Sequence, residues 1–299
     1  MTLFAFEAYE AMAAALQSAT GVLLGRFQVA RFENGELYIL VKSPVKDQDC
    51  VLLGTIAPPE EQVFSALLLA HTLRKEGARK VTAVFPYLAY ARHDKEKPGE
   101  SLAMPWLGAV AQASGIGEVI TVDLHSERGG KQFPVPLISL SPAGLFAEAL
   151  KRCGLVEATI VAPDEGAIGR CEAVKKAAGI APGKTPYFEK HRTASGITHS
   201  GPVGDIGRRV VLIDDILDTG GTLVSACERL GKAGVEEIHV MVTHGLFTGG
   251  RWRDLWRLGV KRIFCTDSVP GVRGVDGGRI ERLSVIPLLK RELCALARV

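Results

Sequence analysis

The stretch that decides the fold reads Val-Val-Leu-Ile-Asp-Asp-Ile-Leu-Asp-Thr-Gly-Gly-Thr and occupies residues 210–222. The uncharged run 210–213 is typical of a strand that is buried on both faces of a parallel sheet. We expect this strand to stop at the paired acids that follow, before the small-residue turn 219–222 and a helical pattern at 223–232. A strand, a Gly-rich turn and a helix start in this order predict an α/β fold with an anion-binding turn at the end of the strand.

The chemistry of the turn indicates a phosphate and its neighbours. Backbone N–H groups and about half a positive charge at the helix start favour an anion, and the hydroxyls of Thr219 and Thr222 can donate. Asp214 and Asp215 would repel a bare phosphate, so they indicate ribose hydroxyls or Mg²⁺, which both need carboxylate oxygens. The alternative is an acidic loop in an ordinary α/β domain, and the attached Asp-Thr-Gly-Gly-Thr argues against it.

Outward from this stretch, short β-branched runs alternate with longer helical patterns, which favours parallel sheets covered by helices. A hairpin-like turn, residues 33–36, joins the strand patterns 29–32 and 37–41. The other expected strands are 50–55, 81–85, 119–122, 159–162, 238–243 and 262–265, and the other expected helices are 60–76, 102–114 and 166–178.

The length of 299 residues suits two domains, and both halves repeat the order strand, acid, helix. This repeat suggests an internal duplication. We therefore predict an N-terminal domain at 1–140 and a C-terminal domain at 141–299, with the last helix packing back on the first domain. The segment 183–207 is rich in Gly, Ser, Thr and basic residues and has no helical period, which indicates a mobile functional arm.

Composition excludes several classes of protein. Lysine and arginine exceed the acids by only 36 − 33 = 3 and are spread along the chain, which argues against a nucleic-acid surface. The uncharged stretch 101–117 is too polar for a membrane span. Glu7 and Glu10 precede the first basic residue, Arg26, the reverse of a leader peptide. The six scattered cysteines indicate buried thiols, so we expect a soluble cytoplasmic protein.

Four further stretches are candidates for chemistry, and each has a structural alternative. Arg92 follows two tyrosines in a planar and basic run, 86–95, where a guanidinium could stack on a base or bind phosphate oxygens. His125 just past a strand end is a metal ligand or a structural histidine. Asp164 before a helix start is a ligand or an N-cap. Lys190 and Arg192 lie in the arm, as a phosphate-binding pair or as part of a solvated basic loop.

Together these stretches form an ordered series that covers nearly the whole chain. They are 32–36, 90–95, 122–125, 162–164, 190–192 and 214–222. Their order and spacing resemble ribose-phosphate diphosphokinase, also called phosphoribosyl-pyrophosphate synthetase. The loop 214–222 alone would fit many phosphoribosyltransferases, whereas the two-domain series is specific to the synthetases.

The resemblance implies two tandem type I phosphoribosyltransferase-like domains, each a mainly parallel sheet flanked by helices. It implies transfer of the β,γ-diphosphoryl group of Mg-ATP to the C1 hydroxyl of ribose 5-phosphate, which gives 5-phospho-α-D-ribose 1-diphosphate and AMP. It also implies a homo-oligomer, a dimer or a hexamer, in which a neighbouring subunit contributes part of the ATP site.

The site residues carry across by position. Phe32 and Arg92 would lie on either side of adenine. The implied ATP-binding set is Phe32, Asn34, Gly35, Glu36, Arg92, His93 and Asp94. The implied metal ligands for Mg²⁺ are His125 and Asp164, and the implied catalytic cations are Lys190 and Arg192. The implied ribose 5-phosphate set is Arg192, Asp214, Asp215, Asp218, Thr219, Gly220, Gly221 and Thr222.

The chain departs from the family pattern at a few positions. Asn34 stands where Asp is common, which removes one expected acceptor for the nucleotide, and His93 stands where Gln is common. Residues 126–131 differ from the usual bacterial pattern, and the short length together with Pro98-Gly99-Glu100 is similar to the archaeal-type branch. Two other functions stay open: a phosphoribosyltransferase, and a non-catalytic nucleotide-binding regulatory subunit. Lys190 and the intact turn 218–222 argue against the second.

Overall fold

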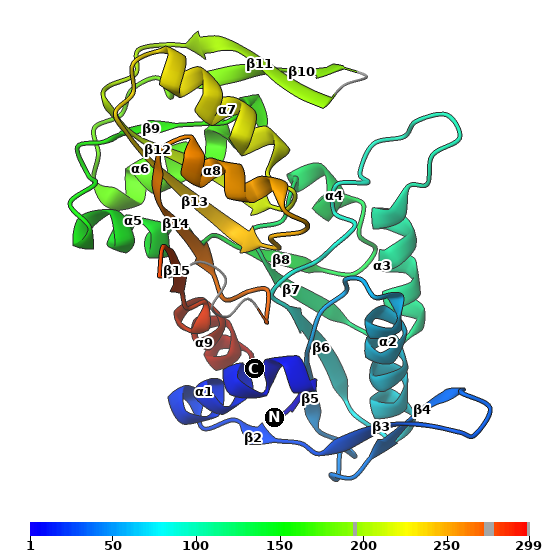
Figure 1. Cartoon of the computed structure of the whole chain (residues 1–299). Helices are drawn as coiled ribbons and strands as arrows, with labels where there is room; N and C mark the ends of the chain where they lie inside the picture. Colours follow the sequence, from blue (N-terminus) through cyan, green and yellow to red (C-terminus); the bar gives the residue numbers. More distant parts are fainter. Residues whose placement is uncertain (194–195, 272–277, 298–299) are drawn as a thin grey trace. The chain divides into compact units, whose positions relative to one another are not determined.

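The computed structural model describes residues 1–193, 196–271 and 278–297, and for 190–193 and 196–199 it describes only backbone (Figure 1). The chain divides into two compact units. The first contains Met1–Leu140 and the C-terminal segment from Val285, and the second is Ser141–Ser284. Each unit is described below by itself.

The first unit is built on a parallel sheet of strand order β2-β1-β5-β6-β7-β8. The strands are β1 (Thr2–Ala5), β2 (Leu23–Leu24), β5 (Asp49–Leu53), β6 (Lys80–Phe85), β7 (Glu118–Val122) and β8 (Leu137–Leu140). The central strands are apolar and buried along their length, as strands covered by helices on both faces must be.

Helices cover this sheet through apolar residues at helical spacing. In α2 (Glu60–Lys75), Ala66, Leu69, Ala70 and Leu73 are buried against the sheet core. The other helices are η1 (Glu7–Tyr9), α1 (Glu10–Thr20), α3 (Ala103–Ala113), α4 (Glu127–Lys131) and α9 (Ile286–Leu296). Helix α9, from the end of the chain, packs against α1.

A separate antiparallel hairpin, β3 (Phe27–Arg31) and β4 (Leu37–Val41), lies outside the sheet and contacts α2 (Figure 1). Strand β4 alternates between half-buried and exposed side chains, and three of the five residues of β3 are exposed, so much of the hairpin is open to solvent. The predicted strand patterns 29–32 and 37–41 correspond to these two strands.

The second unit has a parallel sheet of order β15-β14-β13-β12-β9. The strands are β9 (Thr159–Val161), β12 (Arg209–Leu217), β13 (Glu237–Gly245), β14 (Val260–Thr266) and β15 (Ile280–Leu283). The helices are α5 (Ala143–Arg152), η2 (Glu165–Ala167), α6 (Ile168–Ala178), α7 (Gly221–Lys232), η3 (Arg251–Arg253) and α8 (Asp254–Arg257). Alternate residues of β12 enter two core clusters: Leu212 packs with α7 and α8, and Val211 packs with α5 and α6.

The predicted fold class is confirmed, because two parallel sheets flanked by helices are present. The predicted end of the central strand was wrong. Strand β12 does not stop at Asp214 but continues to Leu217, because its backbone stays paired with β13 as far as Gly245. The segment expected to be a mobile arm contains the antiparallel hairpin β10 (Tyr187–Thr193) and β11 (Gly196–Val203), and β11 packs on α7 (Figure 1).

Within the described residues, no helix combines the length and the apolar character that a membrane crossing requires.

Candidate functional site: a phosphate turn and an open hairpin pocket

The turn between β12 and α7 leaves backbone donors at the helix start. Gly220 is the N-cap of α7 and has a left-handed backbone, φ 88°. Because the cap is a glycine, the first N–H groups of the helix are not satisfied by its side chain. Thr219 is exposed, and Asp218 and Thr222 are half-buried. A dianionic phosphate at this turn would meet helix N–H groups and threonine hydroxyls together.

Two buried acids lie directly upstream of the turn, inside β12. Asp214 and Asp215 are 9% and 6% exposed, and the Asp215 N–H donates to Asp214 Oδ1 at 2.9 Å. Burial, followed by the charge and hydrogen bond of Asp215 and then the charge of Asp164, holds the pKa of Asp214 well above its usual range, and Arg170 opposes this. Such a pair favours a ligand that brings hydroxyl donors or positive charge.

Asp164 follows β9, the neighbour of β12, and therefore lies at the same edge of the sheet as the acids. Its Oδ1 accepts the Gly166 N–H at 3.0 Å and caps η2. The capping interpretation of Asp164 is thus observed. Its role as a metal ligand stays a prediction.

The root of the β10–β11 hairpin is fixed beside Asp164. The Ala162 N–H donates to the Pro186 carbonyl at 2.9 Å, and Ala162 and Tyr187 form a parallel bridge. Phe188 is fully buried, and the pairing with β11 shifts between Phe188 and Lys190. Lys190 and Arg192 belong to strand β10, and their side chains lie outside the described part of the structure.

In the first unit, the turn of the β3–β4 hairpin is closed by its own residues. The Phe32 N–H donates to the Glu36 carbonyl at 2.9 Å, and the Glu36 N–H donates to Asn34 Oδ1 at 3.1 Å. Asn34 therefore supports the turn. Phe32 is 57% exposed, and its ring packs against Tyr38 with ring centroids 4.6 Å apart.

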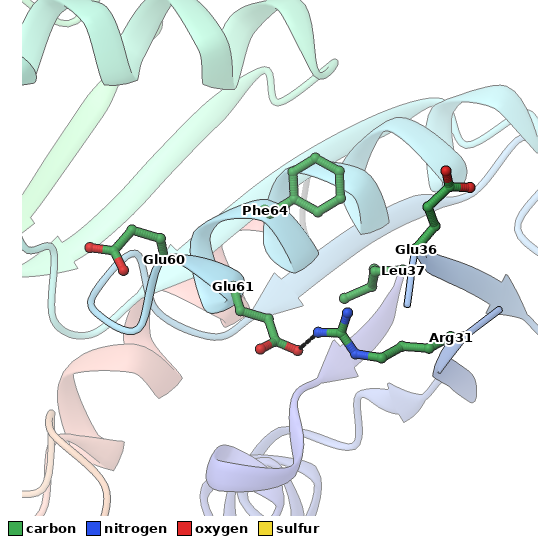
Figure 2. A pocket seen from close by; sticks show the side chains of 6 residues that line it. All are labelled: Arg31, Glu36, Leu37, Glu60, Glu61 and Phe64. Atoms are coloured by element: carbon green, nitrogen blue, oxygen red, sulfur yellow. Dashed lines mark hydrogen bonds and ion pairs between the residues drawn. The ribbon is translucent and has the colours of Figure 1, made fainter. Parts of the chain in front are cut away.

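A pocket of about 610 Å³ lies between this hairpin and the start of α2 (Figure 2). Figure 2 shows Arg31 paired with Glu61, and Phe64 and Leu37 supplying apolar surface. The lining residues are Arg31, Glu36, Leu37, Glu60, Glu61 and Phe64. Three carboxylates against one guanidinium disfavour a triphosphate here and favour a neutral base with N–H donors.

The loop that carries Arg92 is joined to the loop that carries His125. Asp94 is buried and accepts a hydrogen bond from Ser126 Oγ, which in turn accepts the Gly129 N–H at 3.1 Å at the start of α4. Tyr90, in a left-handed conformation, donates from its hydroxyl to Glu60 Oε1 at 3.4 Å. These contacts tie the two loops to each other and to the pocket edge.

The predicted ligand side chains of these loops face solvent. Arg92, His93 and His125 are exposed. Asp123 has φ 47°, and the next residue, Leu124, donates its N–H to Ser139 Oγ at 2.9 Å, so His125 follows a constrained strand end. Strained non-glycine residues of this kind are frequent at functional sites.

Sequence reasoning did not anticipate the contacts that Ser126, Glu60 and Tyr187 make around these sites. Ser126 had a signal, because a serine before an acidic first turn is a common N-cap. Glu60 and the Tyr187–Glu165 hydrogen bond had none, because both contacts join segments that are distant in the sequence.

Within the described chain, no group of three or more His, Cys, Asp or Glu side chains could hold a metal. The donors present still fit Mg²⁺, which prefers oxygen and is often held by one or two carboxylates together with substrate phosphates. Asp164 is half-buried and uses Oδ1 for its cap, so its chemistry suits such a partial site.

Comparison with known proteins identifies related chains of the same length class. Residues 1–115 match the family model described as the N-terminal domain of ribose phosphate pyrophosphokinase, and residues 144–272 match the phosphoribosyl transferase domain. A ribose-phosphate pyrophosphokinase of Thermococcus kodakarensis is 34% identical and spans 91% of this chain and 94% of that protein.

Two further relatives agree. A ribose-phosphate pyrophosphokinase of Ralstonia nicotianae is 26% identical, over 100% of this chain and 95% of that protein. The crystal structure of phosphoribosylpyrophosphate synthetase from Mycobacterium smegmatis matches with a TM-score of 0.89 at 24% identity, covering 99% of this chain and 98% of that one. That structural match supports the fold.

Proposed function

This chain belongs to the ribose-phosphate pyrophosphokinase family, and from this premise we propose that it transfers the β,γ-diphosphoryl group of ATP to ribose 5-phosphate. The products would be 5-phospho-α-D-ribose 1-diphosphate and AMP. The observation that carries the proposal is the second unit's sheet edge, where a phosphate turn adjoins buried acids.

Ribose 5-phosphate would lie on this edge. Its phosphate would bind the N–H groups at the start of α7 and the hydroxyls of Thr219 and Thr222. Its ring hydroxyls would donate to Asp215 and Asp214, whose burial excludes competing water. The remaining turn residues of the proposed site are Asp218, Gly220 and Gly221.

ATP would place its base on the hairpin side. Phe32 is largely exposed and would stack on the base, and the acidic pocket beside Glu36 suits the N–H donors of adenine. Arg92 and His93 are exposed and would contact the nucleotide, while Asp94 would act by holding their loop to Ser126. The exposed hairpin face also supports the proposal that a second copy of the chain completes the site.

The reaction would form a bond between the C1 oxygen and the β-phosphorus and break the bond to the oxygen that leaves with AMP, while the hydroxyl proton passes to solvent. Positioning and charge neutralisation dominate such transfers. Lys190 and Arg192 would neutralise the transferred group, and Arg192 would also contact the sugar phosphate. Bound through Asp164, His125 and phosphate oxygens, Mg²⁺ would supply further charge neutralisation.

The test is AMP formation from ATP, measured with and without ribose 5-phosphate and at varied inorganic phosphate. The proposal requires AMP that depends on ribose 5-phosphate. AMP formation independent of the sugar phosphate, or none at all, would contradict it.

The catalytic role of Lys190 has a separate test. A well-placed cation is worth on the order of 10³–10⁵ in rate, so Lys190→Ala should lose most activity. A variant that retains more than about a tenth of the parent turnover would remove Lys190 from this role.

The metal role of His125 has its own test. His125→Ala should raise the Mg²⁺ concentration required for half-maximal activity, because one ligand is lost. An unchanged Mg²⁺ titration would return His125 to a structural role.

A phosphoribosyltransferase is the second candidate, favoured by the turn 218–222 alone. It would consume 5-phosphoribosyl diphosphate in the presence of a nucleobase. Release of diphosphate from that compound, with no AMP formed from ATP, would favour this alternative.

A further inference from the structure

We propose that residues 245–252, which we call the support segment, position the phosphate turn 218–222, with Phe247 and Trp252 as the positioning residues. The inference rests on the proposed function, because it takes the turn to be the ribose 5-phosphate site. Sequence reasoning assigned this segment no role.

The first observation is a backbone clamp on the residue that precedes the turn. The carbonyl of Leu217 accepts the N–H of Leu246 at 2.9 Å and the N–H of Phe247 at 3.0 Å. Leu217 is the last residue of β12 and is fully buried. Two hydrogen bonds from the support segment therefore fix the residue from which the turn begins.

The second observation is direct backbone contact at the middle of the turn. A Cβ atom on Gly220 would lie 2.7 Å from the Cα of Trp252 and 3.2 Å from its backbone nitrogen. Real Cβ atoms do not approach backbone so closely, so the turn and the support segment fit only because residue 220 is a glycine. The backbone of Trp252 thus packs directly against Gly220, the N-cap of α7, and we call this contact surface the floor of the turn.

The third observation is that aromatic packing fixes the support segment itself. Phe247 has a left-handed backbone, φ 52°, and its ring lies across Gly245. The Phe247 and Trp252 rings meet edge to face with centroids 4.9 Å apart, and Trp252 is fully buried. A non-glycine residue keeps such a conformation only when its surroundings fix it. The packing therefore makes the floor of the turn rigid.

The structure also provides a matched control. Trp256 belongs to the same aromatic cluster, with its ring centroid 6.3 Å from that of Trp252, and α8, which carries it, packs on α7 beside the support segment (Figure 1). Trp256 is half-buried. Its loss should disturb packing without touching the backbone floor of Gly220.

The experiment compares Trp252→Leu, Trp252→Phe, Phe247→Leu and Trp256→Leu by steady-state kinetics, with calorimetric binding of ribose 5-phosphate. The indole Nε1 of Trp252 has no hydrogen-bond partner among the described residues, so phenylalanine should replace the ring without stranding a donor. We expect Trp252→Leu to raise KM and Kd for ribose 5-phosphate about tenfold and to leave KM for ATP within twofold. We expect Trp252→Phe and Trp256→Leu to stay within threefold of the parent.

Phe247 is slightly more exposed than Trp252, and we expect Phe247→Leu to raise KM for ribose 5-phosphate several-fold. This variant still tests the inference if Trp252→Leu does not fold. Equal increases in both KM values, or an unchanged KM for ribose 5-phosphate in both Trp252→Leu and Phe247→Leu, would overturn the inference. A parent that binds ribose 5-phosphate but forms no AMP would refute only the diphosphokinase proposal, because the Kd ratios still test the support segment. A parent that binds no ribose 5-phosphate would refute both.

Discussion

The phosphate turn and the hairpin pocket are built in opposite ways. The turn of the second unit is fixed by backbone contact, with Gly220 against Trp252, and it follows the buried acids of β12. The pocket of the first unit is lined mainly by exposed side chains, which come from a hairpin outside its sheet and from the start of α2. The contrast leads us to expect that the proposed ribose 5-phosphate site is preformed within its own unit, whereas the proposed ATP site is open to solvent.

The largest effect should come from Gly220→Ala, which adds a Cβ where both the left-handed backbone and the floor forbid one. We expect kcat/KM for ribose 5-phosphate to fall on the order of 10²-fold, about 2.7 kcal/mol. Gly231→Ala, inside α7 with no atom near the added Cβ, is the matched control and should retain parent activity. Similar kinetics of the two variants would show that the turn is not preformed.

A smaller effect is expected at the exposed face of the hairpin. Stacking of a base on an aromatic ring is worth about 1–3 kcal/mol, so Phe32→Ala should raise KM for ATP about tenfold or more and leave KM for ribose 5-phosphate unchanged. Leu40→Ala, which truncates another exposed apolar side chain of the hairpin, is the control. A change in KM for ribose 5-phosphate would contradict the separation of the two halves.

The hairpin has its own left-handed glycine, Gly35, with φ 89° and open space around the Cβ position. Gly35→Ala therefore adds backbone strain without a collision, at a cost of about 1 kcal/mol. We expect at most about a fivefold increase in KM for ATP, measured beside Gly220→Ala. An effect as large as that of Gly220→Ala would mean that the hairpin turn is as tightly enclosed as the phosphate turn.

The smallest predicted effect concerns the pH dependence of stability. The pKa of Asp214 is raised by burial and by Asp215, so between its ordinary value of 3.8 and its raised value the folded state binds a proton that the unfolded state releases. Stability is therefore lost as pH rises through this window. Asp214→Asn keeps an acceptor for the Asp215 N–H and removes the titration, so its free energy of unfolding should fall less between pH 4 and 7, as denaturant titrations would measure. A parallel decline in parent and variant would contradict this assignment.

The sequence predicted those features that depend on local pattern. The alternation of apolar runs and helical patterns was sufficient for the two parallel sheets, and the glycines at 220 and 221 were sufficient to place the turn before α7. The prediction for the end of β12 was wrong, because the pairing of Leu217 with Gly245 is a long-range contact that no local sequence pattern indicates. The floor at Trp252 and the link from Tyr90 to Glu60 were missed for the same reason.

The hydroxyl of Ser126 joins two loops of the first unit through a single atom, since it donates to Asp94 and receives the amide that starts α4. The loop of Arg92 and the loop of His125 are thus joined through the hydroxyl of Ser126. Loss of this hydroxyl would remove both hydrogen bonds at once, so the position of one loop depends on the same atom as the position of the other.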